Sequence, residues 1–143
     1  PEAEQTLVSD YESAFEKLQI GANSFIVIAT RGHRYDAVVT AAALRSPASY
    51  IGLLGSKRKT ILIFEELFKA GFTMGQIQGI RSPIGLSISA RTPEEIALSI
   101  MAEIVAFRLG GNGGKLTIDQ RLINKAAEKA KKQHTGVEPV GVD

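Results

Sequence analysis

Two short apolar runs with a helical stretch between them constrain the fold of this chain more than any other feature of its sequence. Residues 25–29 and 49–54 are almost continuously apolar, as in parallel strands that are buried on both faces. Residues 36–45 place apolar side chains at helical spacing, and the pattern ends before Pro47. This order predicts an α/β fold with a parallel sheet flanked by helices.

Two further helices have clear signals at both ends. Ser56 is the expected N-cap of a helix that runs to Ala70, with Gly71 after it. The second begins at Thr92, where Thr-Pro-Glu-Glu predicts a capping box with proline at the first helical position, and it ends at Gly110. Its apolar positions form one stripe that is expected to face the core: Ile96, Ala97, Ile100, Met101, Ile104 and Val105.

Weaker signals surround these elements. Residues 7–8 are expected to form a short strand before a helix over 11–18, and residues 84–88 one extended piece within a turn-rich stretch. After a glycine-rich break, a capping box from Thr117 to Gln120 predicts another amphipathic helix, followed by a frayed tail. We therefore expect a folded domain over residues 1–110 and a separate segment over 111–143.

Composition excludes several classes of protein. With 143 residues, of which 44% are hydrophobic and 22% charged, the chain lies in the globular range. It contains no cysteine, which excludes disulfides, thiolate zinc sites and a cysteine nucleophile within these residues. No apolar run approaches the roughly 18 residues of a membrane-spanning helix, and no signal-peptide pattern opens the chain, so a cytoplasmic protein is expected.

The net charge of +2 is too small to indicate a nucleic-acid-binding protein, but its distribution is uneven. Residues 31–59 hold six Lys and Arg against Asp36 alone, a balance of +5, whereas residues 1–30 hold one Lys against five acids, a balance of −4. The basic residues gather in two loops, at 30–33 and 55–59, each directly after a predicted strand. Because the carboxyl ends of parallel strands share one edge, both loops should open there.

The second loop also begins a helix, whose N-terminus favours an anion, and Gly55 would let that anion approach the backbone. Lys57, Arg58 and Lys59 are unfavourable at a helix N-terminus unless something compensates them, and a bound phosphate or carboxylate would do so. The alternative is that Ser56 merely caps the helix and the three cations form a solvated turn.

Other candidate chemistry is sparse. His33 is either a catalytic base or ligand contact, or a capping or packed loop residue. Asp36 is more readily an N-cap than a catalytic acid, and His134 lies in a polar region where it should be solvated. Two distant histidines without cysteine do not favour a metal site. The glycine-rich dinucleotide fingerprint, the P-loop and the serine elbow are all absent. The residues alone predict an anion-binding edge without a catalytic centre.

Four motifs occur in a fixed order along the chain: Thr30-Arg31-Gly32-His33 with Tyr35-Asp36; Tyr50-Ile51-Gly52-Leu53-Leu54-Gly55-Ser56-Lys57-Arg58-Lys59; Ser82-Pro83-Ile84-Gly85-Leu86; and Thr92-Pro93-Glu94-Glu95-Ile96-Ala97 with Ser99-Ile100 and Ala102-Glu103-Ile104. Together, over about residues 4–110, they closely resemble the C-terminal domain of the XdhC/CoxI family. Members of this family are accessory factors for xanthine dehydrogenase and related molybdenum hydroxylases.

The resemblance implies a Rossmann-type domain in a cytoplasmic protein that binds molybdenum cofactor, works with a cysteine desulfurase and hands the cofactor to an apo-enzyme of the xanthine dehydrogenase type. Such a protein is a chaperone rather than a metabolic enzyme. The residues implied to line the crevice toward the pterin phosphate or a nucleotide are Arg31, Gly32, His33, Gly55, Ser56, Lys57 and Arg58.

The sequence also departs from the family pattern. Ser87 and Ser89 stand where an acidic residue and a glycine are expected. The two strands that would precede the matched region are not present, so in a Rossmann order of 3-2-1-4-5-6 the chain would supply strands 3 and 4–6. We expect the resulting free strand edge to be covered by another segment or by a second copy of the chain. Sulfur transfer cannot be assigned to a chain that lacks cysteine.

Two other functions remain open from the sequence. One is an NAD(P)-binding oxidoreductase domain, which shares the fold class. The other is a protein-interaction module without a ligand, in which the cations meet an acidic partner.

Overall fold

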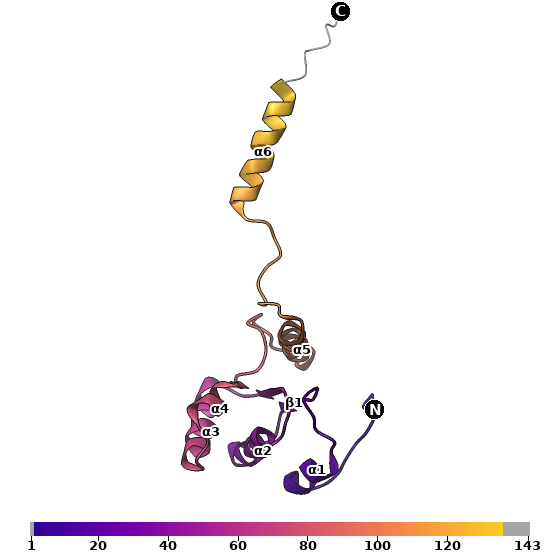
Figure 1. Ribbon diagram of the computed structural model, residues 1–143, viewed down its shortest axis with the longest axis vertical. Helices are drawn as coiled ribbons and strands as arrows, with labels where there is room; N and C mark the ends of the chain where they lie inside the picture. Colours follow the sequence, from indigo (N-terminus) through magenta and orange to yellow (C-terminus); the bar gives the residue numbers. More distant parts are fainter. Residues whose placement is uncertain (1, 136–143) are drawn as a thin grey trace, which may run out of the picture. The chain divides into compact units, whose positions relative to one another are not determined.

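The computed structural model describes residues 2–135, and the chain divides into two compact units, Pro1–Gly111 and Asn112–Asp143. The first unit holds a three-stranded parallel sheet in the order β1-β2-β3 (Figure 1). The strands are β1 (Phe25–Ile28), β2 (Tyr50–Leu53) and β3 (Ile80–Arg81). The Rossmann-like α/β class expected from the sequence is therefore confirmed.

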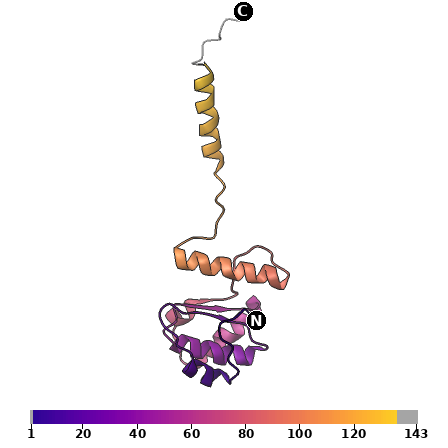
Figure 2. The same cartoon turned by 90° about the vertical axis from the view of Figure 1, so that its right-hand side faces the viewer.

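Helices cover both faces of this sheet. The helices of the first unit are α1 (Tyr11–Lys17), α2 (His33–Arg45), α3 (Lys57–Lys69), α4 (Met74–Gln78) and α5 (Pro93–Leu109). The first four lie on one face, and α5 crosses the other (Figures 1 and 2). The core lies between the sheet and α2–α4, and its buried members are Ile28, Val39, Ala43, Ile51, Leu53, Ile63, Leu67, Ile77 and Ile80.

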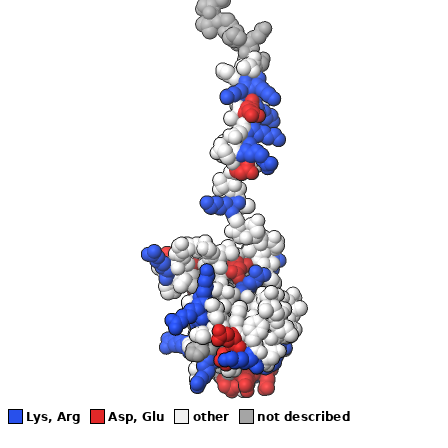
Figure 3. All heavy atoms as spheres, turned by 90° about the vertical axis from the view of Figure 1, so that its left-hand side faces the viewer, with Lys and Arg blue, Asp and Glu red and all other residues white. Residues whose placement is uncertain are grey.

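The described residues of the second unit, 112–135, form one helix, α6 (Gln120–Thr135), none of whose residues is buried. Lys and Arg side chains gather along it (Figure 3). Asp119 accepts a hydrogen bond from the backbone N–H of Leu122 at 3.0 Å. The helix therefore begins at Gln120 behind Asp119, and the capping box expected from Thr117 is wrong.

The two helices with strong capping signals form as predicted. The Ser56 side chain accepts from the Lys59 backbone N–H, and Gly71 follows α3 with a φ of 96°. At the start of α5 the Thr92 capping box is present, and Gly110 closes the helix in the left-handed region. These ends were predictable because each depends on side chains next to it in sequence.

Between α3 and α5 the sequence prediction is wrong in two places. Thr73 and Gln76 form a capping box that begins the short helix α4 within the stretch expected to hold only turns and one extended piece. The third strand is β3 at residues 80–81, whereas the extended piece was expected at 84–88. A two-residue strand pairs by tertiary contact with β2 and leaves no periodic signal in the sequence.

Three further expectations are corrected. Residues 7–8 form no strand, and Val8 is 95% exposed. The strand β1 is not buried on both faces, because Val27 is 42% exposed. The helix α2 begins at His33 behind Gly32, so Asp36 is not its N-cap.

The helix α5 is fastened to the sheet by polar contacts. The Glu103 carboxylate accepts from the Tyr50 hydroxyl at 2.7 Å and from the Gly85 backbone N–H at 2.8 Å. The Ser99 hydroxyl donates to the carbonyl of Leu86 at 2.6 Å. Since Gly85 and Leu86 directly follow the Ser82-Pro83-Ile84 segment after β3, these contacts hold the end of the sheet against α5.

Gly52 gives a test of how closely these layers pack. A Cβ at this position would lie 2.1 Å from Cδ1 of the buried Ile84. We therefore expect Gly52→Ala to lower the free energy of unfolding by about 1–3 kcal/mol through overpacking. Gly75→Ala is the matched control, because its Cβ would meet nothing within 4 Å, and it should stabilise α4 by up to about 1 kcal/mol. Urea denaturation followed by circular dichroism measures both, and equal stability of Gly52→Ala and the parent would contradict this packing.

Tyr50 should make stability depend on pH in the alkaline range. Burial raises the pKa of its phenol, and the hydrogen bond and negative charge of Glu103 raise it further. The unfolded chain, with an ordinary pKa of about 10, then loses this proton before the folded protein does. Stability should fall as pH rises above about 10, and Tyr50→Phe should flatten that fall. Urea midpoints between about pH 8 and pH 11 test this, and equal slopes in both proteins would contradict it.

Candidate functional site

The loops after β1 and β2 meet at the carboxyl edge of the sheet. The backbone N–H of Leu54 donates to the carbonyl of Ile28 at 2.9 Å, which holds the two strand ends together. The chain then runs from each strand into a helix, through residues 29–32 into α2 and through residues 54–56 into α3. The sequence-based expectation that the two basic loops share one edge agrees with this pairing.

A buried carboxylate joins the two loops. Asp36, in α2, has no exposed surface. One of its oxygens accepts a hydrogen bond from the hydroxyl of Thr30, and the other pairs with the ammonium group of Lys59, whose side chain is 25% exposed. Thr30 comes from the loop after β1 and Lys59 from the first turn of α3. A single acidic side chain therefore fastens both helix starts to one point.

This ion pair explains two features that the sequence left open. Lys59 lies at a helix N-terminus because it neutralises Asp36, so a bound anion is not needed to account for this residue. Gly55 is also explained without a ligand, since a Cβ there would lie 2.9 Å from the Cδ of Lys59. The glycine makes room for the lysine side chain as it crosses toward Asp36.

Lys57 and Arg58 are not accounted for in this way. Both lie in the first turn of α3 with exposed side chains, behind the N-cap Ser56. The first N–H groups of a helix lack intrahelical acceptors, and together with the helix dipole they favour an anion. Among residues 2–135 neither side chain has an ion-pair partner, so both cations lie exposed beside an electropositive helix end.

The loop after β1 supplies the other candidate residues. Arg31 is exposed, and Gly32 has a φ of 104°, a conformation that favours glycine, at the N-cap of α2. His33 is the first residue of α2. All seven residues proposed from the sequence thus belong to the two loops at this edge, or to the helix starts that follow them.

A third loop completes the edge. The hydroxyls of Thr60 in α3 and Ser82 after β3 are 2.7 Å apart, and the Ser82 hydroxyl also lies 3.4 Å from the carbonyl of Leu53. The backbone N–H of Ile84 donates to the same carbonyl at 3.0 Å. The segment after β3 is therefore held against the end of β2, beside the start of α3.

Sequence reasoning missed the Asp36–Lys59 pair and the role of Thr30. A signal was present, because Asp36 is the one acidic residue among six cations in residues 31–59. A lone acid in a basic stretch predicts an ion pair, but the sequence does not show which of the six cations takes it. Only the crossing of α2 and α3 brings Lys59 to Asp36.

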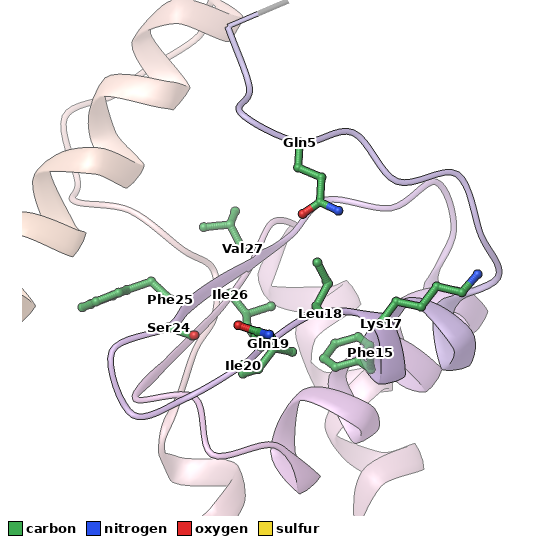
Figure 4. Close-up of a pocket in the computed structure, with 10 residues that line it drawn as sticks. All are labelled: Gln5, Phe15, Lys17, Leu18, Gln19, Ile20, Ser24, Phe25, Ile26 and Val27. Atoms are coloured by element: carbon green, nitrogen blue, oxygen red, sulfur yellow. The ribbon is translucent and has the colours of Figure 1, made fainter.

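A cavity of about 710 Å³ lies away from these loops, along β1 (Figure 4). Residues 17–20 and 24–27 form most of its wall, and Gln5 and Phe15 complete it. It holds none of the basic candidates. The basic side chains and the starts of α2 and α3 lie instead at the carboxyl edge, which is therefore the candidate site.

Three parallel strands between layers of helices, with basic loops at the carboxyl edge, define a Rossmann-like domain. Comparison with known families agrees. The family model described as the XdhC Rossmann domain matches residues 1–104. The chain therefore belongs to the XdhC family.

Individual relatives are consistent with this assignment. The chain is 32% identical over 108 residues to a probable xanthine dehydrogenase subunit from Bacillus subtilis, and 28% identical over 102 residues to the molybdenum cofactor insertion chaperone PaoD of Escherichia coli. These matches cover 76% and 71% of this chain. A crystal structure of a xanthine dehydrogenase from Bacillus halodurans superposes on 76% of this chain with a TM-score of 0.65 and 30% identity.

The match covers a limited part of each of these proteins. It spans 31% of the Bacillus subtilis protein, 32% of PaoD and 31% of the crystallised protein from Bacillus halodurans. Within residues 2–135, no helix is long and apolar enough to cross a membrane.

The Asp36–Lys59 pair can be tested by removing its cation. Lys59→Met leaves the buried carboxylate without its charge partner, and we expect a loss of about 1–3 kcal/mol of stability. This loss is smaller than for a fully buried pair, since Lys59 is partly exposed. Lys57→Met, in the same helical turn but exposed, is the matched control and should change stability by less than about 0.5 kcal/mol.

The double variant Asp36→Asn/Lys59→Met should recover part of the loss, because the uncompensated charge is then absent. Thermal and urea denaturation measure the parent and all three variants. Equal losses for Lys57→Met and Lys59→Met would show that the ion pair does not hold the two loops.

Proposed function

We propose that this domain binds molybdenum cofactor, or its anionic groups, and delivers it to an apo-enzyme of the xanthine dehydrogenase type. One observation carries the proposal: cationic loops from two neighbouring strands open at one edge, beside the N-terminus of α3, in a member of the XdhC family. A relative that shares this domain is an insertion chaperone for the same cofactor.

In this proposal each loop contributes differently to the cargo. Lys57 and Arg58 neutralise the pterin phosphate at the start of α3, where the free backbone N–H groups and Ser56 donate hydrogen bonds to it. Arg31 approaches from the loop after β1. Gly32 and His33 form the start of α2 on the same side of the site as Arg31, and Gly55 keeps the turn before α3 tight.

The Asp36–Lys59 pair acts on this site indirectly. Asp36 neutralises Lys59, so Lys59 adds no net positive charge to the site. The cofactor is instead bound by the exposed side chains of Arg31, Lys57 and Arg58. Exposed Lys and Arg side chains bind an anion without enclosing it, which allows release. An open binding surface is what a delivery protein requires, because the cargo must leave for the apo-enzyme.

The partners follow from the same role. A molybdoenzyme of the xanthine dehydrogenase type receives the cargo. A cysteine desulfurase would meet parts of a longer family member, since this chain has no cysteine to carry sulfur. We also propose that the free edge of β1 is covered, either by a complementing N-terminal segment or by a second copy of the chain. In this role the protein assists an enzyme and is not one itself, and we place it in the cytoplasm.

Direct titration with isolated molybdenum cofactor tests the ligand. We expect saturable binding that weakens with increasing salt, and a loss of about tenfold in affinity for Arg31→Ala or Lys57→Ala, the size of one charge-assisted hydrogen bond. Lys69→Ala is the matched control, because Lys69 is an exposed lysine at the other end of α3. NAD(H) and NADP(H) are titrated in parallel.

The possible outcomes separate three functions. Tighter binding of a nicotinamide dinucleotide than of molybdenum cofactor would favour an oxidoreductase domain. A folded, monodisperse protein that binds neither ligand but retains a molybdoenzyme would be an interaction module. Equal effects of Lys57→Ala and Lys69→Ala on cofactor binding would place the site elsewhere.

A further inference from the structure

The helix α5 has an inner face that its contacts define. Ser99, Glu103 and Phe107 follow one another at intervals of four residues. Ser99 bonds to Leu86, and Glu103 bonds to Tyr50 and Gly85. The ring of Phe107 lies edge-on to those of Phe25 and Tyr50, at centroid distances of 6.0 and 5.2 Å. This row of side chains faces the sheet.

The opposite side of α5 carries a second apolar row. Leu98, Met101, Val105 and Leu109 recur at intervals of three or four residues and are 63%, 54%, 43% and 70% exposed. At about 100° per residue this row is centred about half a turn from the Ser99–Phe107 row. Ala97, Met101 and Val105 were expected on a core-facing stripe, and this expectation is wrong because all three are exposed. A surface helix normally places polar side chains there.

The position of the row decides what can cover it. A helix packed beside α5 on the same face of the sheet would contact its flanks, which lie about a quarter of a turn from the inner face. The outer row points directly away from the sheet. Only a body lying on top of α5, in a further layer, can bury these side chains.

Charges at the two ends of the row indicate what that body is. Glu94 and Arg108 are both exposed and lie on the outer side of the helix, one at each end of the apolar row. They are fourteen residues apart, close to four helical turns. If two copies of α5 cross antiparallel, Glu94 of each faces Arg108 of the other. Met101, midway between residues 94 and 108, then lies at the two-fold axis.

We infer that α5 is a self-association surface, and that two copies of this chain pair through antiparallel α5 helices. The surface is complementary to itself, as a two-fold interface requires, with an apolar centre and opposite charges at its ends. The dimer buries Leu98, Met101, Val105 and Leu109 of both copies. It leaves the carboxyl edge of each sheet free, since α5 lies on the face of the sheet and not at that edge.

Sedimentation equilibrium of the full chain across a wide concentration range tests the pairing. We expect a monomer–dimer equilibrium that Met101→Lys weakens by at least about tenfold, because two like charges would meet at the axis. Ile61→Lys is the matched control, since Ile61 is 58% exposed on α3 and lies outside the proposed surface. It should change the dimer dissociation constant by less than about twofold.

A charge exchange tests the antiparallel register. Glu94→Arg and Arg108→Glu should each weaken the dimer, because each places like charges together, and the double variant should restore it. Far-ultraviolet circular dichroism confirms that each variant keeps its helices. The antiparallel register is overturned if each single change weakens the dimer and the double variant is weaker than either single variant.

Cross-linking gives an independent measure. The chain has no cysteine, so a single introduced cysteine reports one position. Met101→Cys should form an intermolecular disulfide under mild oxidation, since antiparallel helices bring equivalent positions near the axis within reach. Ile61→Cys should not. A chain that stays monomeric at all concentrations, or a dimer that is unaffected by Met101→Lys and joins through the β1 edge or α6, overturns the inference.

Discussion

The ion pair between Asp36 and Lys59 is the contact on which the candidate site depends. A carboxylate without exposed surface is costly unless its charge is compensated, and Lys59 and Thr30 compensate it. Thr30 lies in the loop after β1 and Lys59 lies in the first turn of α3. Breaking their contacts with Asp36 would expose a buried charge without a partner, so these contacts keep the starts of α2 and α3 together. The exposed cations Lys57 and Arg58 are thereby placed on a helix beside the loop that carries Arg31, and the edge needs no enclosed cavity to present them together.

Glu103 has the equivalent role on the other face of the sheet. Its two oxygens accept from a side chain of β2 and from the backbone after β3, so one residue of α5 fastens two parts of the chain that lie far apart in sequence. Gly85, with a φ of 107°, lets the backbone pass close to Ser99 at this point. The inner face of α5 is thus fixed by these polar contacts together with the packing of Phe107, and within residues 2–111 nothing covers the apolar outer row.

The parts of the fold that were predictable from the sequence are those with local causes. Ser56, Thr92 and Gly110 determine helix ends through bonds to their neighbours, and the apolar runs of β1 and β2 are continuous. The start of α2 was misplaced because Gly32, with its positive φ, caps the helix where Asp36 was expected to do so. At the site, the sequence indicated the two basic loops, but it could not show that Lys59 turns inward to Asp36 while its neighbours extend outward. That difference arises from the packing of α2 against α3, which no local pattern encodes.

The strand β1 is one of the two edge strands of the sheet. Its carbonyl at Ile28 accepts from Leu54 at the end of β2, and backbone groups alternate along a strand, so the N–H and C=O groups of Phe25 and Val27 point away from β2. Such an edge recruits a strand by main-chain hydrogen bonds, whereas the outer row of α5 recruits a helix by side-chain burial. The two surfaces therefore differ in the partner they select. A longer family member can cover an edge strand with a strand of its own, whereas in the pairing that we propose the self-complementary row of α5 is covered by the same row of a second copy.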